Sequence, residues 1–130
     1  MNQKEEEKLI IQKFRNSFRD FPKGKLIPTE SPDFVLRISP KKRIGIELIQ
    51  LYYSEELIEG IRAAMIKKEA KLPLYRSMNL SELWLLIHSD DAFSGLNFNF
   101  DNKLNNLNVL SSFNRIFLFD LFSDKIYPFH

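Results

Sequence analysis

A lone glutamate interrupts one of the most apolar segments of this chain. Glu47 is the only charged residue of the run 44–49, whose composition predicts a strand buried on both faces. Side chains alternate along a strand, so Gly45 and Ile49 share the face of Glu47, and neither can neutralise a carboxylate. A buried carboxylate loses hydration worth several kcal/mol unless it is paired, hydrogen-bonded or bound to a metal. Glu47 is therefore the first candidate for chemistry.

A second carboxylate, Asp33, opens the preceding strand and is expected to face Glu47. A hairpin loop centred on Pro40 places the two residues directly opposite, where their Cβ atoms would lie about 4.5–5.5 Å apart. Like charges at this separation repel each other unless a cation lies between them. Hard oxygen ligands suit Mg²⁺, which takes one or two carboxylates and keeps waters for a phosphate substrate. The pair therefore predicts a divalent-metal site.

The elements that would position this pair follow from hydrophobic periodicity. Apolar residues at three- and four-residue spacing predict helices over 5–18 and 54–71, the second ended by Pro73, and more weakly over 101–111. The segment 22–28 is interrupted by Pro22, Gly24 and Pro28 and predicts a break. Apolar runs predict strands over 34–38, 43–51, 82–88, 115–121 and 125–128. We expect one α/β (α+β) domain over residues 1–130, with a mixed four- to five-stranded sheet flanked by helices.

Together these features resemble the PD-(D/E)XK nuclease superfamily. The residues that carry the resemblance are Pro32-Asp33 at the start of one strand and Glu47 in the middle of the next, with helices before and after. It covers roughly residues 5–72, and the strand at 82–88 stands in the place of the next core strand. It implies a restriction-endonuclease-like core and metal-dependent hydrolysis of phosphodiester bonds in nucleic acid. It also implies that Asp33 and Glu47 bind Mg²⁺ or Mn²⁺.

The superfamily's lysine, two positions beyond the acid, orients or activates the attacking water. Ile49 occupies that position here and cannot do so. Gln50 could turn inward at a bulge, since glutamine substitutes for the lysine in some members. Alternatively, the basic group comes from the following helix, where Lys68 lies on the apolar stripe and Arg62 is the second choice.

The resemblance also implies a further acid from the first helix. Glu7 shares the face of Ile10, Ile11 and Phe14 and is the preferred third metal ligand, with Glu30 as the alternative. Basic residues at 41–43 on the predicted hairpin tip, and at 67, 68 and 71, could touch a phosphate backbone or simply be a solvated surface.

Two other interpretations keep the fold without the chemistry. Because Ile49 replaces the lysine, the chain could be an inactive nuclease-like binding or immunity-type module that acts through a protein partner. It could also be a structural domain in which Glu47 pairs with Arg37 or Arg62. A chain this short holds little beyond the core, so target selection would require a homodimer or a partner protein.

Composition excludes several classes and names none. The 130 residues carry 19 Lys+Arg against 17 Asp+Glu, a net charge of +2 that is too weak to indicate nucleic-acid binding by itself. Cysteine is absent, which excludes disulfides and thiolate zinc sites. Apolar runs are far shorter than the roughly 18 residues of a membrane span. The acidic, polar N-terminus is unlike a signal peptide, so we expect a cytoplasmic protein with no membrane contact.

Overall fold

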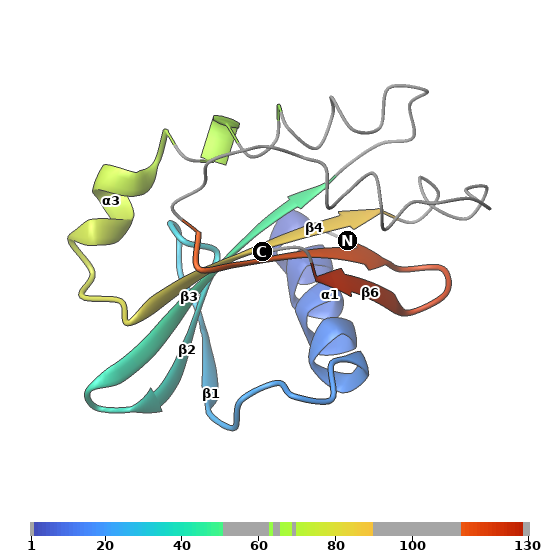
Figure 1. The fold of residues 1–130 in the computed structure, drawn as a ribbon, viewed down its shortest axis with the longest axis horizontal. Coiled ribbons are helices and arrows are strands. Elements are labelled where there is room, and N and C mark those ends of the chain that lie inside the picture. Colours follow the sequence, from blue (N-terminus) through green and yellow to red (C-terminus); the bar gives the residue numbers. More distant parts are fainter. Residues whose placement is uncertain (1, 51–62, 64–65, 69, 90–112, 129–130) are drawn as a thin grey trace.

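The computed structural model describes residues 2–50, 63, 66–68, 70–89 and 113–128. In this part of the chain, six strands form one mixed sheet in the order β1-β2-β3-β4-β5-β6, and a long helix packs on one face (Figure 1). The elements are α1 (Gln3–Ser17), β1 (Lys25–Pro28), β2 (Phe34–Ser39), β3 (Lys42–Gln50), α3 (Leu72–Arg76), β4 (Glu82–Ser89), β5 (Arg115–Asp120) and β6 (Lys125–Pro128). The α/β class predicted from the sequence is thus confirmed. No helix within the described ranges has the length and apolarity needed to cross a membrane.

The sheet combines two antiparallel margins with a parallel centre. Strands β1, β2 and β3 form an antiparallel meander, β3, β4 and β5 run parallel, and β6 returns antiparallel to β5. The parallel strands need cover on both faces, which accounts for their continuous apolar sequences. Every residue from Leu83 to Ile87 is buried accordingly.

Helix α1 covers one face of the sheet, here called the α1 face. Asn2 caps the helix by accepting a hydrogen bond from the Glu5 backbone N–H at 2.9 Å. Phe14 is fully buried, and its ring lies 5.2 Å from that of Phe117 and 5.5 Å from that of Phe119. The residues of β2–β5 that form this core with α1 are Phe34, Leu36, Ile44, Ile46, Leu48, Trp84, Leu86, Phe117 and Phe119. Strand alternation directs the intervening residues to the opposite face, here called the α3 face.

The hairpin register expected from a loop centred on Pro40 is confirmed. Phe34 pairs with Ile46 and Arg37 with Arg43, and the register shifts only between Arg37 and Ser39, next to the turn. One step beyond the Phe34 pair, Asp33 therefore comes level with Glu47.

One prediction about local structure is wrong. In the described part of the chain the sheet has six strands rather than four or five, because β1 forms where the sequence predicts a break. Pro28 is tolerated there because it ends a short strand at the sheet edge. The helical residues 66–68 give way to a turn at 70 and 71, near the predicted end at Lys71. Pro73 then lies in the first turn of a separate helix, α3, which the sequence did not predict, and its missing N–H has no helical acceptor to lose there. Residues 66–68 are helical as predicted, whereas 54–62 and 101–111 lie outside the described residues.

Candidate functional site

Glu47 is buried on the α3 face and is held by two donors from the chain that follows β3. Only 1% of its surface is exposed. The Lys68 ammonium lies 2.9 Å from Oε1, and the Tyr75 hydroxyl donates a hydrogen bond to Oε2. Lys68 comes from the helical residues 66–68 and Tyr75 from α3. The ion pair is therefore formed with Lys68 rather than with the exposed Arg37, and Arg62 lies outside the described residues.

Asp33 lies immediately before β2 and is anchored through its backbone and its side chain. Its carbonyl accepts a hydrogen bond from the Thr29 N–H at 2.9 Å, and its Oδ2 accepts one from the Leu48 N–H at 2.8 Å. Its carboxyl group is also close enough to that of Glu47 to raise the pKa of Glu47. The structure thus brings the two predicted acids side by side.

The surroundings of the pair favour the neutral form of Glu47. Burial raises the pKa of Glu47 from 4.5 to about 7, and the hydrogen bond with Asp33 and its charge act in the same direction. The hydrogen bonds from Tyr75 and Lys68 lower this pKa but do not outweigh the other effects. Burial, followed by the hydrogen bond with Glu47, also raises the pKa of Tyr75, so the phenol stays a neutral donor. Such a site favours either a proton or a cation.

A cavity of about 780 Å³ adjoins the pair. It opens between the first half of α1, the segment before β2 and the end of β3. Four of the five predicted site residues line it, namely Glu7, Asp33, Gln50 and Lys68, together with the alternative Glu30. Glu47 does not line the cavity, and its two oxygens are engaged by Lys68 and Tyr75.

These donors fit a divalent cation in part. Two adjacent carboxylates beside a cavity with room for several waters match the preference of Mg²⁺ for one or two carboxylates plus waters. In the described part of the chain, no group of three or more His, Cys, Asp or Glu side chains is placed to hold a metal ion. Glu7 is buried on the cavity wall and is not a third member of such a group. Each Glu47 oxygen accepts one hydrogen bond, from Lys68 or from Tyr75, so coordination by Glu47 would have to use the remaining lone pairs.

Two residues near the site were not selected as candidates from the sequence. Tyr75 carried no signal, because α3 begins at Leu72 as a separate helix and its distance along the chain from Glu47 says nothing about contact. His88 pairs with Gln50 across the parallel ladder, lines the cavity and is 6% exposed. Burial lowers its pKa to about 4, so the imidazole is neutral at physiological pH. The run at 82–88 predicted the strand that carries His88, but not the cavity beside it.

Comparisons with protein-family models, curated proteins and solved structures find no match for this chain. The function must therefore be argued from the site itself.

Proposed function

We propose that the protein is a metal-dependent nuclease that hydrolyses phosphodiester bonds in nucleic acid, with Asp33 and Glu47 as ligands of Mg²⁺ or Mn²⁺. The observation that carries the proposal is the pairing of two carboxylates beside a cavity, with their negative charge only partly compensated. Burial raises the pKa of Glu47 most, and Asp33 raises it further, so both effects disfavour the ionised form of Glu47. A divalent cation at the pair would polarise a phosphate and lower the pKa of a bound water.

The order of elements supports a restriction-endonuclease-like core, which is part of the proposal. Helix α1 precedes the hairpin, Asp33 lies immediately before β2, and Glu47 lies within β3. Helical residues follow, and β4 then pairs in parallel with β3. This is the arrangement that the resemblance to the PD-(D/E)XK superfamily implies.

We assign to Lys68 the role of the superfamily's lysine, whose position Ile49 occupies in this chain. Its ammonium is only 2.9 Å from the Glu47 carboxylate and also borders the cavity, so it can orient water and stabilise negative charge that develops there. Gln50 is exposed at the end of β3 and lines the same cavity, where it can hydrogen-bond to water or substrate. Glu7 faces the cavity from α1 and can accept a hydrogen bond from a metal-bound water.

A second candidate function is an inactive nuclease-like module that acts through a protein partner. The observation that favours it is the burial of Glu47. Its side chain is 1% exposed, and its two oxygens accept hydrogen bonds from Lys68 and Tyr75. In this function the Lys68 ion pair and the Tyr75 hydrogen bond hold the segment after β3 against the sheet, and no metal binds.

Cleavage assays on the full chain distinguish the two functions. Plasmid DNA, single-stranded DNA and RNA are each incubated with Mg²⁺, with Mn²⁺ or with EDTA. The nuclease function predicts metal-dependent cleavage that Glu47→Gln and Asp33→Asn abolish. The matched control is Asp20→Asn, which neutralises an exposed carboxylate outside the cavity and should leave cleavage unchanged. Absence of cleavage, together with a melting temperature that neither metal changes, would favour the inactive module.

A further inference from the structure

Three cations lie in a row across the antiparallel part of the sheet. Lys25 of β1 pairs with Arg37 of β2, and Arg37 pairs with Arg43 of β3. Neighbouring strands are about 4.8 Å apart, so the three side chains start at roughly that spacing. Lys25 and Arg37 are exposed, and Arg43 is half-buried. We call these three residues the cation row.

The cation row lies on the α3 face, which also carries Asp33 and Glu47. The row's neighbours along the strands, Leu26, Leu36 and Ile44, pack into the core beneath α1. Strand alternation therefore turns the row to the other face. Arg43 precedes Glu47 by four residues on β3, which corresponds to about 13 Å along the strand. The row and the carboxylate pair thus lie on the same face of the sheet, separated by the buried Gly45, which Leu80 and Pro32 cover.

Within the described part of the chain, the row is not neutralised by carboxylates. The side chains of Lys25 and Arg37 form no hydrogen bond or ion pair there. The Arg43 guanidinium donates to the Met78 carbonyl at 3.3 Å, a contact that fixes its position without cancelling its charge. Like charges directly opposed on neighbouring strands destabilise a sheet. An arrangement that costs stability in the free protein is best explained by an anionic partner.

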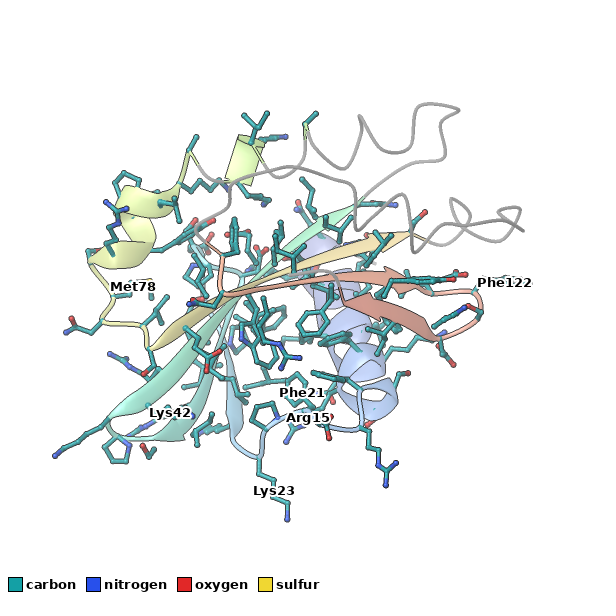
Figure 2. The ribbon with its side chains drawn as sticks, viewed as in Figure 1. Arg15, Phe21, Lys23, Lys42, Met78 and Phe122 are labelled. Carbon is teal, nitrogen blue, oxygen red and sulfur yellow. The ribbon has the colours of Figure 1, made fainter. Side chains whose placement is uncertain are left out.

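The hairpin tip extends the positive charge beyond the row. Lys41 and Lys42 are exposed beside Arg43, and Figure 2 labels Lys42 at this end of the sheet. Lys23, also labelled there, is a further exposed cation that precedes β1. Cations therefore gather at the end of the hairpin, whereas the carboxylate pair and the cavity lie near its opposite end.

We propose that the cation row binds the phosphate backbone of a nucleic acid on the face of the sheet that carries the carboxylate pair. The choice of partner rests on the proposed function, whereas the binding itself does not require hydrolysis. A nucleic-acid duplex carries one negative charge per about 3.4 Å on each strand, a density that matches closely spaced cations. A protein surface of mixed charge offers no such continuous series of negative charges.

The experiment measures binding without cleavage. The full chain is titrated in EDTA against three fluorescently labelled probes of 20 nucleotides or base pairs: single-stranded DNA, single-stranded RNA and duplex DNA. Anisotropy at several salt concentrations gives the affinity and its salt dependence. The variant is Lys25→Gln/Arg37→Gln. The matched control is Lys8→Gln/Arg19→Gln, which removes two exposed cations elsewhere. The two single substitutions, Lys25→Gln and Arg37→Gln, serve as a second series if the double variant folds poorly.

Each phosphate contact contributes about 0.7 to the salt slope for single strands and about 0.9 for duplex DNA. We therefore expect the double variant to lower the slope by about 1.4 to 1.8. At 0.1 M salt this corresponds to a loss of affinity of about 25- to 60-fold. Each single substitution should remove about half of the slope change, and the control should bind as the parent protein does. The probe that shows the full effect identifies the form of nucleic acid.

Two outcomes would overturn the inference. One is equal binding by the row variant and the control, and the other is no binding of any probe by the parent protein at low salt. If the parent protein cleaves nucleic acid and the row variant cleaves equally well, binding by the row is refuted and the nuclease function stands. If binding depends on the row but no metal-dependent cleavage occurs, binding by the row stands and the nuclease function is refuted.

Discussion

Glu47→Gln tests whether the ionised carboxylate of Glu47 stabilises or destabilises the folded protein. The substitution preserves the size of the side chain and removes its charge, and the new amide can still donate a hydrogen bond to Asp33. An ordinary structural ion pair would predict a loss of stability, because Lys68 would lose its partner. The raised pKa of Glu47 predicts the opposite at alkaline pH.

The magnitude follows from proton linkage. A glutamate whose pKa is 4.5 in the unfolded chain and about 7 in the native state binds more protons when folded between these values. Its contribution to stability is therefore fully present below about pH 4.5 and is lost as the pH rises through 7. The full difference is about 3 kcal/mol, at 1.36 kcal/mol per pKa unit. Glu47→Gln should remove this dependence, so the variant should be more stable than the parent at pH 8.5 by up to about 3 kcal/mol and nearly equal to it at pH 4.5.

Urea denaturation at pH 4.5, 6, 7 and 8.5 measures the effect. Trp84 is the only tryptophan and is 2% exposed, so its fluorescence reports unfolding of the core. Asp20→Asn is the control and should follow the parent at every pH. A Glu47→Gln variant that is less stable than the parent by a similar amount at all four pH values would refute the reasoning. In that case the ionised Glu47–Lys68 pair would stabilise the fold outright.

The remaining predictions concern metal binding, the assigned lysine and the packing behind Asp33. At pH 8, Mn²⁺ at a hundredfold excess over its Kd should raise the stability of the parent by about 2.7 kcal/mol and leave Glu47→Gln unchanged in urea denaturation; an equal gain in both proteins would place the metal elsewhere. Lys68→Met should reduce cleavage at least about 100-fold, while Mn²⁺ still raises the melting temperature of this variant. Gln50→Ala should reduce cleavage less than Lys68→Met does. If Gln50→Ala has the larger effect in the same assay, the role of the missing lysine belongs to Gln50. Gly45→Ala would place a Cβ 2.6 Å from Leu80 Cδ1 and 2.9 Å from Pro32 Cγ. It should therefore lower the free energy of unfolding by about 1–3 kcal/mol and weaken the Mn²⁺-induced stabilisation, because Pro32 precedes Asp33; a fully stable variant would show that this contact relaxes freely.

Local features of the chain were sufficient to predict that Asp33 and Glu47 lie side by side in the candidate site. A short loop sets the register of a hairpin, so the pairing of Phe34 with Ile46 followed from the position of Pro40 alone. That register brings Asp33 level with Glu47. The apolar surroundings of Glu47 likewise predicted its burial, because alternation in a strand is a property of the backbone.

Contacts between distant segments could be only partly anticipated. Lys68 was one of two basic candidates on its helix, and its selection as the partner of Glu47 depends on how that helix crosses the sheet. Tyr75 could not be foreseen, because it reaches Glu47 from a short helix that begins where Pro73 predicted only an end. The pKa of Glu47 depends on burial and on both of these neighbours, so no local pattern could supply it.

The sequence by itself determined the apolar strands, the hairpin and the acid pair, since all three depend on residues close together in the chain. The tertiary structure alone decided that β1 joins the sheet and completes the cation row, and that a cavity opens beside Asp33. The physical reason is the range of the interactions. Backbone alternation and turn geometry act over a few residues, whereas an edge strand and a cavity exist only once segments far apart in the chain have packed together.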